Sequence, residues 1–135
     1  MSWGSAVVSF RGLSAPEDLV APMSVDTVYT RAERLRSSEG RTLQHWAGRL
    51  AAKHAVLRLL GVPATAESLG GVEVLPRPSA LCARNAACLH GHPPEVRLHD
   101  PLRAAAGRIR ISVSHTADLA VAVALTAGDL PEDTP

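Results

Sequence analysis

Hydrophobic and polar positions alternate most clearly near the end of the chain. Ile109, Ile111 and Val113 alternate with polar residues, and a second run over 119–125 alternates larger apolar residues with alanines. A period of two is typical of a β-strand, because successive side chains of a strand point to opposite faces. The polar residues SHTAD separate the two runs. This pattern predicts a β-hairpin with a polar tip.

The middle of the chain has the pattern of a helix. From Thr42 onward, apolar residues cover most of a helical circumference, and Gly61 followed by Pro63 ends the run. Two narrow basic edges interrupt the apolar surface. Arg49 and Lys53 form one edge and His54 with Arg58 forms the other. Small alanines lie beside the second edge and leave room for a ligand.

The remaining segments have weaker patterns. Alternation over Met23–Tyr29 predicts a strand with Asp26 on its more polar face, and GVEVLPRP and EVRL predict two further short strands. Residues 31–44 are charged and interrupted by glycine, which indicates a helical turn and a loop. We expect an N-terminal extension over 1–22, one domain over 23–128 and a flexible tail over 129–135.

Composition and charge narrow the class of protein. The chain has 135 residues, of which 46% are hydrophobic and 20% charged, and it lacks the apolar run of a membrane helix, so we expect one soluble domain. Its net charge of +1 and its 3% aromatic content argue against a nucleic-acid partner. The N-terminus lacks the pattern of a secretory signal, and we expect a cytoplasmic protein without disulfides.

The segment CARNAACLHGH holds four residues that can bind zinc. They are Cys82, Cys88, His90 and His92. The spacing lacks the close cysteine pair of common zinc sites, which favours a loop with incidental ligands. We also expect Trp3 to belong to the chain terminus and Trp46 to pack within the protein, and neither to contact a cofactor.

Three stretches together resemble a known family. WAGRLAAKHAVLRLLG, EVLPRPS and RISVSHTADLAVAVAL are similar, in order and spacing, to the holo-acyl-carrier-protein synthases, the small class of 4'-phosphopantetheinyl transferases. The similarity covers residues 23–126. In that family an early strand carries an aspartate in a Gly-aliphatic-Asp context, the helix carries Arg-Phe-Ala-Ala-Lys-Glu-Ala, and a late strand ends in Ser-His-Thr or Thr-His-Thr. SVDTV, RLAAKHA and SVSHT resemble these three motifs.

The resemblance implies a fold and an activity. The implied fold is α+β, like that of the 4'-phosphopantetheinyl transferases, with one long helix packed on an antiparallel sheet. The implied reaction transfers 4'-phosphopantetheine from coenzyme A to a serine of an acyl or peptidyl carrier protein of fatty-acid or polyketide biosynthesis, and it releases adenosine 3',5'-bisphosphate. Family members of this size are homotrimers with coenzyme A between subunits. The carrier protein is expected to be acidic.

The resemblance also implies roles for individual residues. Asp26 matches the early aspartate that holds Mg²⁺, and Arg49 and Lys53 match basic residues of the helix that contact coenzyme A. The tip residues, also expected at the coenzyme, are Ser114, His115 and Thr116. From the residues alone, a solvated edge is the favoured interpretation of Arg49 and Lys53, and an ordinary polar turn that of the tip. The resemblance reverses this preference.

Two helix residues depart from the family pattern. His54 occupies the position of the glutamate that binds Mg²⁺, and Arg58 occupies that of a lysine with phosphate-binding and proton-transfer roles. Imidazole is a poor ligand for Mg²⁺. Three readings follow: Asp26 and waters hold Mg²⁺ weakly, which we rank first; another ion such as Mn²⁺ replaces it, bound by Asp26 and His54; or protonated His54 neutralises the pyrophosphate itself.

Arg58 stays protonated and is no base, so water or His54 must accept the serine proton if the chain catalyses transfer. A second hypothesis follows from the same two departures. The chain is then a diverged subunit that binds coenzyme A or a carrier protein without catalysing transfer. Recruitment of the fold to another reaction is a third option, since fold does not determine function.

Overall fold

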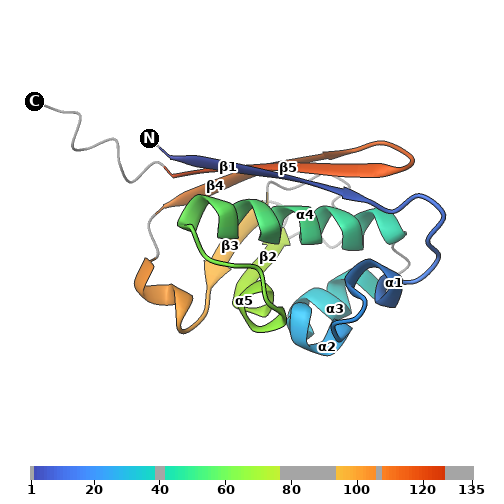
Figure 1. Ribbon diagram of the computed structural model, residues 1–135, viewed down its shortest axis with the longest axis horizontal. Coiled ribbons are helices and arrows are strands. Elements are labelled where there is room, and N and C mark those ends of the chain that lie inside the picture. Colours follow the sequence, from blue (N-terminus) through green and yellow to red (C-terminus); the bar gives the residue numbers. More distant parts are fainter. Residues whose placement is uncertain (1, 39–41, 77–93, 106–107, 127–135) are drawn as a thin grey trace, which may run out of the picture.

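The computed structural model describes residues 2–38, 42–76, 94–105 and 108–126. These residues form three layers, with the long helix α4 (Leu43–Leu60) between a three-stranded sheet and a layer of short helices with a two-stranded sheet (Figure 1). The other elements are β1 (Trp3–Ser9), α1 (Pro16–Val20), α2 (Val25–Val28), α3 (Arg31–Ser38), α5 (Ala66–Gly70), β2 (Val72–Pro76), β3 (Pro94–Leu98), a 3₁₀ helix (Leu102–Ala105), β4 (Ile109–His115) and β5 (Leu119–Thr126).

The three-stranded sheet is antiparallel in the order β1, β5, β4. β4 and β5 form the predicted hairpin, with His115 opposite Ala120 nearest the turn. Strands β2 and β3, predicted from GVEVLPRP and EVRL, pair antiparallel in the second sheet. The α+β fold with one long helix on an antiparallel sheet is therefore confirmed. CARNAACLHGH and the tail over 129–135 lie outside the described residues.

The prediction that residues 1–22 form an N-terminal extension is wrong for residues 3–9, which belong to the three-stranded sheet. This segment is β1, an edge strand that pairs along its whole length with β5, from Trp3 opposite Leu125 to Ser9 opposite Leu119. Its alternate residues Gly4 and Ala6 are buried against α4. The run AVV was the sequence signal for this strand, but its small and polar neighbours obscured the alternation. The outer boundaries of the domain stay a prediction.

The prediction of a strand over Met23–Tyr29 is also wrong, because Val25–Val28 form helix α2 and Ser24 and Tyr29 are its caps. The Ser24 side chain accepts a hydrogen bond from the Asp26 main-chain N at 3.1 Å and caps the helix. The buried side chains are the consecutive residues Val28 and Tyr29, not alternate ones. Local capping and burial of one end therefore override a short alternating pattern.

Helix α4 agrees with its prediction at both ends. Thr42 is its N-cap, and Gly61 ends it in the left-handed conformation, with φ of 70°. The helix is buried around most of its circumference because layers pack on both of its sides. None of the helices in the described part of the chain has the length and hydropathy that a membrane crossing requires.

Candidate functional site

The second basic edge of α4 lies against β1. The Arg58 guanidinium Nη1 donates to the Ser5 carbonyl oxygen at 2.7 Å, and the Arg58 side chain is exposed. His54, one turn earlier, is half-buried. Burial lowers the pKa of His54, and the positive charge of Arg58 lowers it further. His54 is therefore a neutral imidazole at pH 7, able to accept a proton, beside a permanent cation.

The polar tip of the β4–β5 hairpin lies beside the start of α4. Gln44 Nε2 donates to the Thr116 carbonyl oxygen at 3.2 Å. The Thr116 hydroxyl oxygen accepts from the main-chain N of Asp118 at 3.2 Å and of Leu119 at 3.1 Å. These bonds hold the turn in one conformation. Ser114 and His115, like Thr116, are exposed to solvent.

The tip and the second basic edge are separated along α4 within one chain. His54 comes ten residues after Gln44, which holds the tip, so the two are about 15 Å apart along a helix that rises 1.5 Å per residue. Arg58 is a further turn away. One molecule therefore does not bring His115 together with His54 and Arg58. A site that uses both groups needs a second copy of the chain.

Lys53 lies inside the protein and not at a ligand site. Its Nζ is 2.7 Å from Glu33 Oε1 and donates to the carbonyl oxygens of Leu69 at 2.9 Å and Val72 at 2.5 Å. Both charged side chains are fully buried. Burial lowers the pKa of Lys53, and the Glu33 carboxylate opposes that shift. These contacts are incompatible with the expected contact between Lys53 and coenzyme A.

Glu33 is a key polar residue that the sequence analysis missed. Its carboxylate also accepts from the main-chain N of Thr30 at 2.8 Å and of Val74 at 2.7 Å, so it joins α3 to β2 and α4. A carboxylate on a short charged helix gives no sequence signal for burial. Arg49, the other residue of the first edge, is half-buried and donates through Nε to the Val74 carbonyl oxygen at 2.9 Å and through Nη1 to Ser37.

Asp26 lies in a different part of the molecule from His54. It belongs to α2, in the layer of short helices on the opposite side of α4 from the three-stranded sheet (Figure 1). Its carboxylate is exposed and 3.5 Å from Arg34 Nε, and its carbonyl oxygen accepts from Arg34 Nη1 at 3.0 Å. Nothing in the described hydrogen bonds or ion pairs joins Asp26 to His54, and the charge that acts on His54 is that of Arg58.

The residues present do not fit a Mg²⁺ site of the kind that the resemblance implies. That site needs an aspartate on an early strand and a glutamate on the helix. The early strand is β1, whose sequence WGSAVVS contains no acidic residue, and the helix carries His54. Mg²⁺ binds proteins mainly through carboxylate oxygens. Among the described residues, no three His, Cys, Asp or Glu side chains are grouped to hold a metal ion.

Comparison with solved structures shows the class of protein to which this architecture corresponds. The chain is similar to an acyl carrier protein synthase of Mycobacterium tuberculosis, with 25% identity, a TM-score of 0.61, and coverage of 91% of this chain and 93% of the other. It is also similar to the holo-[acyl-carrier-protein] synthase of Helicobacter pylori, solved with coenzyme A, with 19% identity, a TM-score of 0.66, and coverage of 93% of this chain and 99% of the other. For the holo-[acyl-carrier-protein] synthase of Neisseria meningitidis, the identity is 20%, the TM-score is 0.68, and the coverage is 93% of this chain and 96% of the other.

These three structures are matched over 93%, 99% and 96% of their own length. The chain therefore has the fold of the holo-[acyl-carrier-protein] synthases, and the resemblance inferred from its sequence is confirmed at the level of the fold. No protein-family sequence model matches the chain, and no curated protein matches it significantly.

Proposed function

We propose that this protein binds coenzyme A and transfers its 4'-phosphopantetheine to a serine of an apo acyl carrier protein in the cytoplasm. The observation that carries this proposal is the fold shared with holo-[acyl-carrier-protein] synthases, three of which were solved with coenzyme A or its 3',5'-ADP part. The retained His115 tip and the basic edge of α4 support it. Both groups are at least partly open to solvent.

The proposed reaction breaks one bond of the coenzyme A diphosphate. The serine oxygen forms a bond to the phosphorus that carries pantetheine, and the bond from that phosphorus to the bridging oxygen breaks. Adenosine 3',5'-bisphosphate leaves with the bridging oxygen. The serine proton passes to neutral His54 or to water, because Arg58 is permanently charged. Arg58 stabilises the negative charge that grows on the leaving phosphate.

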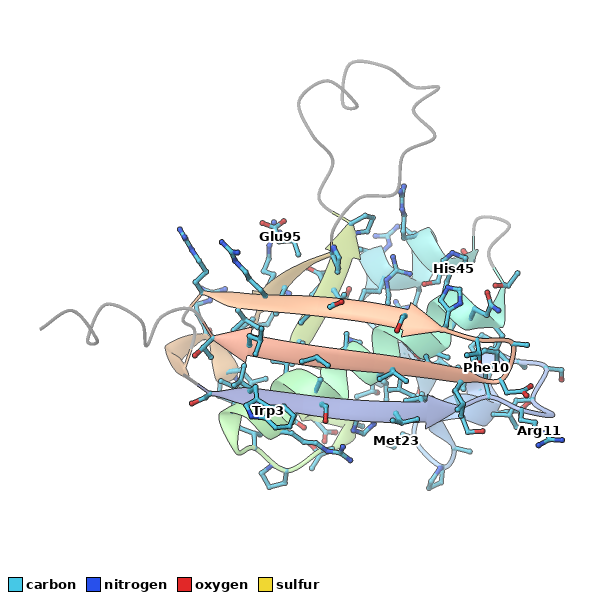
Figure 2. All side chains as sticks on the ribbon, turned by 90° about the horizontal axis from the view of Figure 1, so that it is seen from above. Trp3, Phe10, Arg11, Met23, His45 and Glu95 are labelled. Atoms are coloured by element: carbon cyan, nitrogen blue, oxygen red, sulfur yellow. The ribbon has the colours of Figure 1, made fainter. Side chains whose placement is uncertain are left out.

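The proposal includes a homotrimer, since one chain does not complete the site. The face of the three-stranded sheet that points away from α4 exposes several large apolar side chains, and Figure 2 looks onto this face. We call it the outer face; its exposed apolar residues are Trp3, Val7, Leu119, Val123 and Leu125. Apolar residues that are neighbours on exposed strands favour burial against another protein surface. A second copy packed there would supply the missing half of the site.

The expected carrier-protein partner is acidic. Helix α4 and strands β1, β4 and β5 together contain no aspartate or glutamate, although the whole chain has a net charge of only +1. Arg58 and Arg110 are exposed on these elements. The surface around the proposed site is therefore locally basic, which favours an acidic partner.

A second candidate function is binding without transfer. The absence of an acidic residue from β1 and the presence of His54 on α4 favour it, because the carboxylates expected to assist the chemistry are missing while the basic side chains remain. The protein would then bind coenzyme A or a carrier protein as a subunit of a larger assembly.

A transfer assay separates the two candidates. The full chain is incubated with coenzyme A and an apo carrier protein, with EDTA, Mg²⁺ or Mn²⁺, and the carrier is analysed by intact-mass spectrometry. We expect a mass increase of one phosphopantetheine group. A carrier whose acceptor serine is replaced by alanine is the control and should not change in mass.

If the mass of the carrier does not change, a parallel calorimetric measurement of coenzyme A binding shows how to interpret that result. Binding without any mass increase would support the second candidate. Absence of both binding and transfer under all three conditions would contradict the proposed transferase and a subunit that binds coenzyme A.

A further inference from the structure

The layer that contains the proposed site has an unusual charge composition. Among the ionisable residues of α4, β1, β4 and β5, arginine, lysine and histidine are present and carboxylates are absent. The acidic residues of the described chain lie on other elements and in loops. They are Glu17, Asp18, Asp26, Glu33, Glu67, Glu73, Glu95, Asp100 and Asp118.

Several of these carboxylates are already engaged elsewhere. Glu33 is buried against Lys53, and Glu73 accepts from the Thr30 hydroxyl at 2.6 Å. Asp26 faces Arg34 on the far side of α4. Asp118 lies in the β4–β5 turn, at the opposite end of the sheet from Arg58, which contacts β1 at Ser5. A divalent cation at the second basic edge would therefore meet a histidine and an arginine, and no carboxylate from the four elements that form the layer.

The close contact between β1 and α4 leaves few positions for an added ligand. A Cβ atom placed on Gly4 would lie 2.5 Å from the Ala55 carbonyl oxygen and 2.6 Å from the Leu59 main-chain N. Ala6, the next strand residue on this side, is buried and has no polar atom in its side chain. The guanidinium of Arg58 stands at the open edge of this contact. Within the described part of the chain, Nη1 is the one guanidinium nitrogen that donates a hydrogen bond, to Ser5, so donors remain for an anion.

We propose that the second basic edge of α4 binds the diphosphate of coenzyme A directly, through the guanidinium of Arg58 and without a divalent cation. The inference rests on the proposed function, because it concerns the same coenzyme. A guanidinium carries a permanent charge and presents several donors that match phosphate oxygens in pairs. It can therefore replace the charge of a metal ion at a diphosphate. Half-buried, neutral His54 adds a hydrogen-bonding group without requiring a carboxylate.

Calorimetric titration of the full chain with coenzyme A tests this inference without relying on activity. We expect the dissociation constants in EDTA and in millimolar Mg²⁺ to differ by less than about twofold, because no cation takes part in binding. In electron paramagnetic resonance, the signal of free Mn²⁺ should stay undiminished when protein is added, with or without coenzyme A. Arg58→Gln should weaken binding at least about tenfold, since it removes charge-assisted hydrogen bonds.

Arg31→Gln is the matched control, because Arg31 is an exposed arginine on α3, outside the site. It should leave the dissociation constant unchanged. Circular dichroism of each variant verifies that it is folded. Coenzyme A binding that strengthens tenfold or more with Mg²⁺, or Mn²⁺ bound in proportion to protein, would refute this inference and leave the proposed function standing. Failure to bind coenzyme A with or without metal would refute both.

Discussion

At the scale of single residues, the neighbours Lys53 and His54 have opposite environments. The Lys53 side chain points away from the three-stranded sheet into the layer of short helices, where Glu33 and two carbonyl oxygens surround its ammonium group. His54 is half-open to solvent and near Arg58. The difference follows from the helix, because adjacent residues differ by about 100° around its axis. Two adjacent basic residues on one helix therefore serve different purposes, one structural and one available to a ligand.

Replacement of Lys53 by methionine should strongly destabilise the protein. The substitution keeps much of the side-chain volume but leaves the Glu33 carboxylate buried without its counter-charge, so we expect a loss of about 3–5 kcal/mol in the free energy of unfolding. Urea denaturation measures this loss. Arg58→Met on the same helix is the control and should cost no more than about 1.5 kcal/mol, since it removes one exposed hydrogen bond. Equal losses for the two variants would contradict the structural role of Lys53.

At the scale of elements, the packing of β1 on α4 holds residues 3–9 against the long helix. Gly4 lies where the strand crosses the helix backbone, and there is no space for a side chain between them. Alanines at both surfaces, including Ala55 on the helix and Ala122 on β5, allow a similarly close approach of helix and sheet. The edge strand is thus held by hydrogen bonds to β5 and by backbone contact with α4.

Gly4→Ala should destabilise the protein by about 1–3 kcal/mol, because the added methyl group must displace helix or strand backbone. This change is measured by thermal unfolding, with circular dichroism in the helix band as the signal. Ser5→Ala is the matched control at the next strand position. It keeps the carbonyl oxygen that Arg58 contacts, and it should change stability by less than about 0.5 kcal/mol. A Gly4→Ala protein as stable as the wild type would show that β1 is not closely packed on α4.

At the scale of the whole molecule, the two sides of the three-stranded sheet have different roles. One side packs on α4, and the outer face leaves large apolar side chains in solvent, Trp3 among them at 65% exposure. The pairing register places Trp3 beside Leu125 and Val7 beside Val121, so the apolar side chains are contiguous across strands. The proposed trimer would bury this surface and join the hairpin tip of one copy to the α4 edge of another.

Val7→Asp should convert the proposed trimer to monomers, since a charge would be buried at the proposed interface. Light scattering coupled to size-exclusion chromatography measures the molar mass. Leu35→Asp is the control, because Leu35 is similarly exposed but lies on α3, away from the sheet. It should leave the molar mass unchanged. A wild-type protein that is monomeric at micromolar concentration would contradict the proposed trimer.

The sequence by itself determined the elements whose signals are local. The period-two pattern of the hairpin and the glycine-terminated helical run predicted β4, β5 and α4, and the motifs on them indicated the fold. Only the tertiary structure decided which charged residues are buried and which early segment is a strand. The partner of Lys53 lies 20 residues earlier at Glu33, and β1 becomes a strand through pairing with β5 at the other end of the chain. Such long-range contacts leave no periodic signal, because their energy arises only when distant segments meet.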